Sequence, residues 1–171
     1  MKHLVILFIS LFCLVSFAQV DPALAKEYYQ KGDFEKALVL YKKLLKTSRS
    51  SPDYILKVIE CHQQLNQLKA AKEYIETQIL QSWHPQFLVE LGYNYQLQKK
   101  PKLASSNYDQ ALLIIEQQPE YVYGVGQRFE SHSLLNQAIQ AYEIGLAVAP
   151  NACLLYTSPS PRDTLRSRVP S

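Results

Sequence analysis

Apolar residues recur at intervals of three and four along residues 19–151, which predicts amphipathic helices. The pattern of these helices repeats. The segment 31–45, KGDFEKALVLYKKLL, has counterparts at 66–80, 99–113 and 133–147. Such a period of 33 to 34 residues predicts an array of similar helical units, because one unit of this size cannot bury its apolar face alone.

Each copy has an alanine followed by a large side chain four residues later and by another eight residues later. The alanines are Ala37, Ala71, Ala104 and Ala138. The residues four positions later are Tyr41, Ile75, Tyr108 and Tyr142. The residues eight positions later are Leu45, Ile79, Leu112 and Leu146. Spacing by four places the three residues of each copy on one face of a helix.

A second amphipathic segment precedes each alanine. Twelve residues before the alanines, at what we call the small position, stand Ala25, Ile59, Gly92 and Gly126. Nine residues before them, at the aromatic position, stand Tyr28, His62, Tyr95 and Phe129. Prolines at 52, 85 and 119 fit the first turn of each leading helix, where no N–H is required. Asp21 and Ser51 are predicted N-caps. Small residues let two helices approach, and an aromatic ring fills the remaining space.

This combination resembles the tetratricopeptide repeat, a helix pair of 34 residues with small and aromatic residues at fixed offsets. The resemblance covers residues 18–151 and is closest at LGYNYQL, 91–97, and QAIQAYEIGLAVAPN, 137–151. The second copy departs most, at Ile59, His62 and Gln78. The resemblance implies an all-α, right-handed superhelical solenoid of four helix-turn-helix repeats, at about 18–51, 52–84, 85–118 and 119–151.

The resemblance also implies a binding surface, because the leading helices of this family line a concave groove that accepts peptides. Carried over position by position, the groove comprises Lys26, Tyr29, Leu56, Glu60, Gln63, Val89, Tyr93, Gln96, Tyr123, Gln127 and Glu130. A mixture of tyrosine, glutamine and scattered charge is typical of protein-binding surfaces. The alternative is a solvated face without a dedicated ligand. Some relatives clamp a C-terminal carboxylate with Lys, Asn and Arg; Pro22, Glu60 and Gly124 stand here instead, so we do not expect binding of chaperone tails.

The two ends of the chain differ from the repeats. A basic start, the apolar run from Leu4 to Val15 and small residues at Ser16 and Ala18 predict a signal peptide over residues 1–18, with cleavage before Gln19. An uncleaved membrane anchor is the alternative. We therefore expect a periplasmic or secreted protein that meets the membrane only transiently through this segment. Residues 152–171 are expected to be disordered or artefactual, since CLLYTSPSPRDTLRSRVPS resembles a translated sequencing adapter; if so, the natural protein continues beyond residue 151.

Charge and cysteine content argue against several other functions. Four of the 18 Lys and Arg residues and one of the 15 Asp and Glu residues lie outside 19–152, so that segment carries 14 of each and no net charge. Such a balance gives no electrostatic surface for nucleic acid. Cys61, the single cysteine of the repeats, cannot form an internal disulfide, and Cys61-His62 is expected to pack in the core. His84 and His132 have no acidic companion in register and are expected to be capping or solvated.

These observations predict a non-catalytic scaffold that binds a protein or peptide segment outside the cytoplasm. No metal and no small-molecule cofactor are expected. Two alternatives remain open: the extracytoplasmic input domain of a truncated signalling protein, and the repeat region of a larger enzyme.

Overall fold

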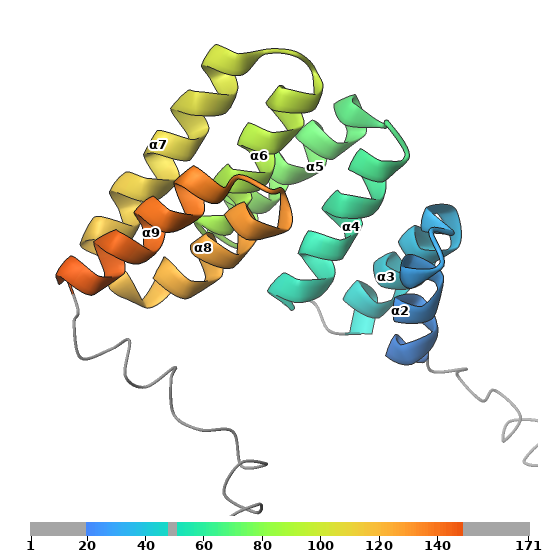
Figure 1. Cartoon of the computed structure of the whole chain (residues 1–171). Helices are drawn as coiled ribbons and strands as arrows, with labels where there is room; N and C mark the ends of the chain where they lie inside the picture. The colour runs from blue at the N-terminus through green and yellow to red at the C-terminus, as the bar shows by residue number, and fades with distance from the viewer. Residues whose placement is uncertain (1–19, 48–50, 149–171) are drawn as a thin grey trace, which may run out of the picture. The chain divides into compact units, whose positions relative to one another are not determined.

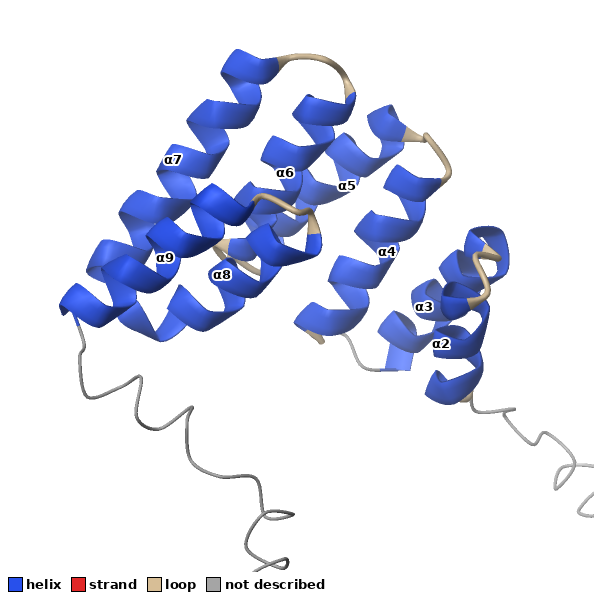
Figure 2. Ribbon diagram, viewed as in Figure 1, coloured by secondary structure: helices blue, strands red, loops and turns tan. Residues whose placement is uncertain are grey.

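The computed structural model describes residues 20–47 and 51–148, and within these ranges all regular structure is helical (Figures 1 and 2). The predicted signal peptide, its cleavage point and the C-terminal tail lie outside the described residues. The described part of the chain divides into two compact units, one within residues 1–61 and one within 62–171, which we call unit 1 and unit 2 and describe separately. In the described ranges no helix is both long and apolar enough to cross a bilayer.

Unit 1 is built on the pair α2 (Pro22–Gln30) and α3 (Phe34–Thr47), which pack against each other. Asp21 is the N-cap of α2, as the sequence predicts: its carboxylate accepts a hydrogen bond of 2.8 Å from the N–H of Ala23. Helix α4 (Pro52–Gln64) begins in this unit, where the Tyr54 ring lies 6.0 Å from that of Tyr41.

Unit 2 contains α5 (Leu68–Gln81), α6 (Gln86–Leu97), α7 (Pro101–Gln117), the 3₁₀ turn η1 (Pro119–Tyr121), α8 (Val122–Ser131) and α9 (Leu135–Val148). Helix α6 packs against α5, α7 and α8, and α8 packs against α9. Helices α6 to α9 share one apolar core, which contains Val89, Tyr108, Ile115 and Phe129. Each helix pair of the described chain lies inside one of the four predicted repeat ranges.

The small and aromatic positions meet as the sequence predicts. A Cβ added to Gly92 would collide with the ring of Tyr108, and one added to Gly126 would collide with the ring of Tyr142. Four alanines that follow these positions, Ala37, Ala71, Ala104 and Ala138, are buried. The prediction of an all-α array of helical repeats is therefore confirmed. One member of the pattern differs: Leu146 is 55% exposed, although the pattern predicts an interior face.

The turn within each helix pair has the same backbone conformation. A residue with positive φ follows each leading helix, at Gly32 (78°), Asn66 (54°), Lys99 (59°) and Ser133 (58°). The next N–H then donates to the carbonyl of the aromatic position, as from Lys100 to Tyr95 (2.9 Å) and from Leu134 to Phe129 (2.9 Å). This arrangement satisfies carbonyls that a helix end leaves unpaired.

Only glycine adopts this left-handed conformation without cost, which leads to a stability prediction. A non-glycine residue in this conformation costs roughly 1–2 kcal/mol, which a change to glycine removes. Part of this stabilisation is offset, because glycine has more conformational freedom in the unfolded chain. We expect Lys99→Gly to raise the free energy of unfolding by about 0.5–1 kcal/mol, measured by urea denaturation. The control Gln110→Gly, inside α7, should lower it by about 1 kcal/mol. A destabilised Lys99→Gly variant would contradict the assigned turn.

Candidate protein-binding surfaces

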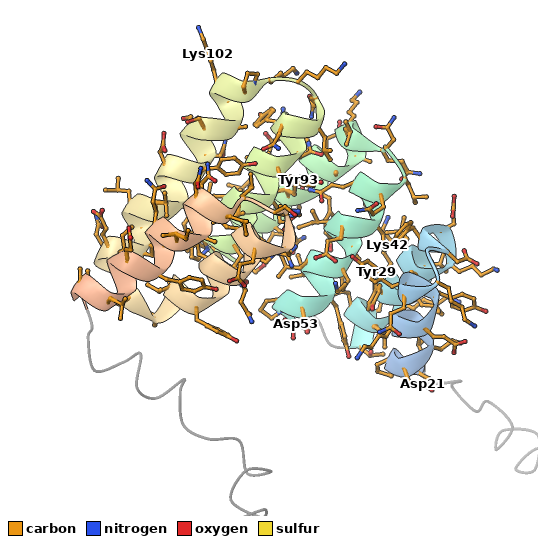
Figure 3. All side chains as sticks on the ribbon, viewed as in Figure 1. Asp21, Tyr29, Lys42, Asp53, Tyr93 and Lys102 are labelled. Atoms are coloured by element: carbon orange, nitrogen blue, oxygen red, sulfur yellow. The ribbon has the colours of Figure 1, made fainter. Side chains whose placement is uncertain are left out.

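A pocket of about 340 Å³ lies in unit 1 between the two leading helices α2 and α4. Lys26 and Tyr29 line it from α2, Tyr54 and Lys57 from α4, and Tyr41 from α3. Figure 3 shows the side chains of this unit, with Tyr29 and Asp53 labelled. Lys26 and Tyr29 are both members of the groove that the sequence predicts, so the structure brings these two together at one cavity.

Contacts among the lining side chains fix the shape of this pocket. The Lys57 ammonium lies 4.1 Å from the centre of the Tyr29 ring, within the range of a cation–π interaction. The same ammonium is 2.6 Å from Glu60 Oε2. Tyr29 also contacts the Phe34 ring edge to face, with centroids 5.5 Å apart. Because Tyr29 is held by both contacts, little of its side-chain freedom remains to be lost when a ligand enters.

The remaining lining groups decide what the pocket offers to a ligand. Burial raises the pKa of Tyr41 to about 12, so its phenol stays neutral at physiological pH. Lys26 and Asp53 are exposed at the pocket and carry opposite charges. The site thus combines aromatic walls with two lysines, Lys26 and Lys57, and one carboxylate, Asp53. A few polar groups in a largely apolar pocket serve to orient a ligand.

Unit 2 presents a polar surface on α6 and α8. Gln96, Tyr123, Gln127 and Glu130 are exposed there, and Tyr93 is half-buried. The amide of Gln127 donates to the Tyr123 hydroxyl over 2.7 Å, which holds the exposed ring. Gln96 accepts a hydrogen bond of 3.0 Å from the Tyr108 hydroxyl. These five residues belong to the predicted groove and are accessible to a partner. That a partner contacts them stays a prediction.

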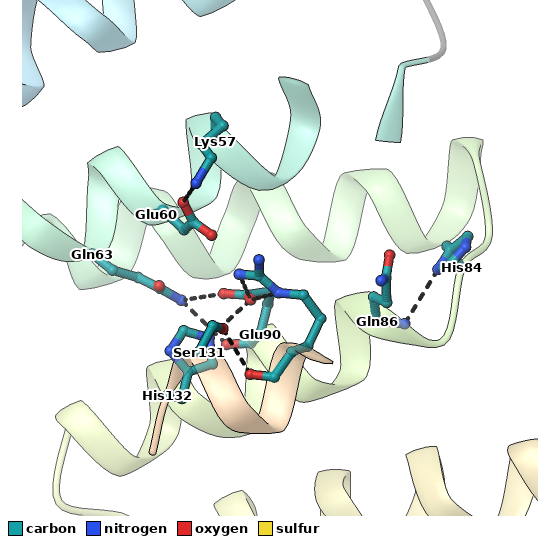
Figure 4. A network of polar contacts seen from close by, with 9 residues as sticks. Lys57, Glu60, Gln63, His84, Gln86, Glu90, Ser131 and His132 are labelled. Carbon is teal, nitrogen blue, oxygen red and sulfur yellow. Dashed lines mark hydrogen bonds and ion pairs between the residues drawn. The ribbon is translucent and has the colours of Figure 1, made fainter. Parts of the chain in front are cut away.

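A network of polar contacts surrounds Glu90 of α6 (Figure 4). The side chain of Glu90 is fully buried. Its Oε1 accepts hydrogen bonds from Arg128 Nε at 2.8 Å and from the Arg128 NH2 group, and His132 Nε2 lies 2.9 Å away. Its Oε2 accepts one of 3.1 Å from the Gln63 amide. The carboxylate therefore joins residues at the end of α4, in α6 and at the end of α8.

The electrostatics of this cluster favour the ionised carboxylate. Burial disfavours the charge of Glu90, but the Arg128 guanidinium and the hydrogen bond from His132 outweigh it and lower the pKa to about 2. The His132 ring in turn stacks on Tyr93, with centroids 3.7 Å apart and planes 15° from parallel. The cluster thus fixes the orientation of Tyr93, which reaches the surface.

Four of the predicted groove residues are buried and do not offer surface to a partner: Leu56, Glu60, Gln63 and Val89. For these four residues the prediction of a place on an accessible groove is corrected, because their side chains are buried. Val89 lies in the apolar core that α6 shares with its neighbours, and the Gln63 amide is engaged by Glu90. Lys26, Tyr29, Tyr93, Gln96, Tyr123, Gln127 and Glu130 remain accessible.

The histidines and the cysteine of the repeats differ in how far their environments match the predictions. The expectation that His132 has no acidic companion is wrong, because it contacts Glu90. His84 packs edge to face on Tyr121, with centroids 4.9 Å apart. Cys61 is buried as expected, and burial raises the pKa of its thiol to about 12, which suppresses the nucleophilic thiolate. Among the described residues no cluster of His, Cys, Asp and Glu could hold a metal ion.

Comparisons with known proteins agree with this architecture. Residues 28–82 match the tetratricopeptide repeat family. No curated protein sequence matches the chain. Among solved structures, the Yersinia enterocolitica type III secretion translocator chaperone SycD is 21% identical, with a TM-score of 0.53 over 73% of this chain and 89% of that one. MamA is also 21% identical, with a TM-score of 0.46 over 77% of each chain. The match to the tetratricopeptide repeat family therefore covers residues 28–82, which contain α3, α4 and α5.

Proposed function

We propose that this chain is a non-catalytic protein-interaction scaffold that binds a peptide or protein segment through the accessible side chains of its leading helices. The observation that carries the proposal is the pocket between α2 and α4, in which Tyr29 contacts both Lys57 and Phe34. Tetratricopeptide-type repeats provide the rigid support that such a surface needs.

The chemistry of the pocket favours a peptide that inserts a bulky apolar or aromatic side chain. Tyr29, Tyr41 and Tyr54 surround the cavity with rings, and aromatic pairs prefer the edge-to-face and offset arrangements that a partly aromatic pocket allows. Lys26 and Asp53 supply opposite charges for groups flanking the inserted side chain. On unit 2, the exposed side chains of Tyr123 and Gln127 offer a further surface that can form hydrogen bonds with a partner.

A random peptide library displayed on phage, selected on the full chain, tests this proposal. Selected peptides should contain an aromatic or bulky apolar residue, and titration calorimetry should show binding that weakens at least about tenfold in Tyr29→Ala, since a hot-spot side chain contributes about 2 kcal/mol or more. Lys26→Glu, an exposed change that leaves the core intact, should also weaken binding. Leu113→Ala, exposed on α7, is the matched control.

Unchanged affinity in both Tyr29→Ala and Lys26→Glu would rule out the α2–α4 pocket as the binding site. A circular dichroism spectrum and melting curve of each variant separate loss of binding from loss of folding.

We further propose that the protein acts outside the cytoplasm. The basic start, apolar run and small residues of positions 1–18 support this location. The mature N-terminus should then be Gln19, as determined by N-terminal sequencing of protein made in a Gram-negative host. A mature form that retains Met1 to Ala18 would contradict export with cleavage.

A further inference from the structure

The pocket between α2 and α4 already contains a cation that belongs to the protein. The ammonium of Lys57 lies 4.1 Å from the centre of the Tyr29 ring. It also lies 2.6 Å from Glu60 Oε2, one helical turn further along α4 (Figure 4). An aromatic face and a carboxylate both attract ammonium and guanidinium groups. The place in this pocket that suits the cation of a ligand is therefore taken by a lysine of the chain itself.

The repeat itself does not require a lysine at this position. Fourteen residues before the alanine of the pattern, the other three copies have residues of other types: Ala23, Glu90 and Gly124. The contact between Tyr29 and Lys57 corresponds to that between Gln63 and Glu90 one repeat later, which is a hydrogen bond of 3.1 Å. Leading helices thus make this contact without a lysine, and the positive charge is a property of the α2–α4 pocket.

The charges that line the pocket are unfavourable for a second cation. Lys26 and Lys57 are positive, and Asp53 is the single carboxylate of the lining. The side chain of Lys57 is only 35% exposed, so water and salt screen its charge incompletely. A cationic side chain that enters the cavity meets two like charges, and such juxtaposition weakens binding. An uncharged ring meets no such repulsion and can pack against the tyrosine rings.

We infer that Lys57 is a specificity-determining residue, which excludes Lys and Arg side chains from the pocket and leaves it to an uncharged aromatic side chain. The inference rests on the proposed function of the pocket and names the class of side chain that it accepts. Specificity of this kind comes from repulsion of the wrong ligand as well as from contacts with the right one. Removal of the ammonium should uncover the Tyr29 ring for a cation of the ligand, while the Asp53 carboxylate remains.

Titration calorimetry with two matched peptides tests the role of Lys57. A peptide selected by phage display on the wild-type chain is synthesised with either Phe or Arg at the position on which its binding depends. The wild type should bind the Arg form at least about tenfold more weakly than the Phe form. Lys57→Met keeps a long unbranched side chain without the charge. In this variant the ratio of the two dissociation constants should fall at least about tenfold, because the repulsion is lost and a new cation–π contact becomes available.

Two control variants separate the effect of this ammonium from other causes. Lys57→Arg retains a cation beside Tyr29 and Glu60, so it should keep the wild-type ratio. Lys42→Met removes an exposed lysine of α3 that lies outside the pocket lining, and it should also keep that ratio (Figure 3). Circular dichroism and a melting curve check the folding of each protein. Lys57→Gln is the second uncharged variant and replaces Lys57→Met if the latter folds poorly.

The outcomes distinguish a failure of this inference from a failure of the proposed function. A peptide that binds the wild type but not Tyr29→Ala establishes the pocket as the binding site. An unchanged ratio in the uncharged variants of Lys57 would then overturn the role of Lys57 alone. An equal fall of the ratio in Lys42→Met would also overturn it, since general charge would explain the preference. If the library yields no peptide, the proposed function fails and the inference fails with it.

Discussion

Replacing Glu90 with glutamine is expected to lower the free energy of unfolding by about 3 kcal/mol at pH 7, because the change removes the charge that compensates the partly buried Arg128. The pKa of Glu90 gives the same magnitude. A shift from 4.5 in the unfolded chain to about 2 in the folded protein corresponds to about 3 kcal/mol of stability. Urea denaturation of the two proteins measures this difference.

The pH dependence of this effect has a definite sign. Since the folded protein holds the carboxyl ionised more strongly, the contribution of Glu90 is complete above pH 4.5 and is lost as the pH falls toward 2. The difference between wild type and Glu90→Gln should therefore shrink on acidification. Glu73→Gln, exposed on α5, should change stability by less than about 0.5 kcal/mol. A Glu90→Gln variant as stable as this control would contradict the arrangement of the cluster.

Truncating Tyr108 to alanine is expected to cost about 3–5 kcal/mol. The side chain is almost fully buried, fills the space left by the absent side chain of Gly92, and contacts the Phe129 ring. Its hydroxyl also donates to Gln96. Thermal and urea denaturation measure the loss, and the variant should retain a cooperative transition at lower temperature.

Tyr123→Ala is the matched control for Tyr108→Ala, because its ring is exposed on α8. This change should alter stability by less than about 0.5 kcal/mol. Equal destabilisation by both substitutions would show that the assignment of interior and surface tyrosines is wrong.

The repeat could be predicted from the sequence because its residues contact one another at fixed local offsets. Gly92 and Tyr108 are separated by the same number of residues as Gly126 and Tyr142, and both pairs pack as the spacing predicts. The exposure of Leu146 could not be predicted in this way. Its position in the pattern gives the face of α9 on which it lies, but exposure depends on whether another helix covers that face.

The partial failure of the predicted groove has a similar cause. Val89 was assigned by its offset, yet α6 packs against three helices and retains little free surface. The Glu90 cluster was missed because its partners Arg128 and His132 are distant in sequence and do not follow the repeat period. One signal was present: a glutamate inside the apolar segment FLVELGY implies a buried charge, which requires a partner.

Site-specific photo-crosslinking tests most directly the claim that the leading helices bind the partner. A photoreactive amino acid is placed in turn at positions 26 and 123, on leading helices, and at positions 80 and 113, which are exposed on trailing helices. Each protein is irradiated with a peptide selected on the wild-type chain, and the crosslinked fraction is quantified by mass spectrometry. Crosslinks from position 26 or 123, with none from 80 or 113, are the predicted result. Crosslinks confined to positions 80 and 113 would contradict a binding surface on the leading helices.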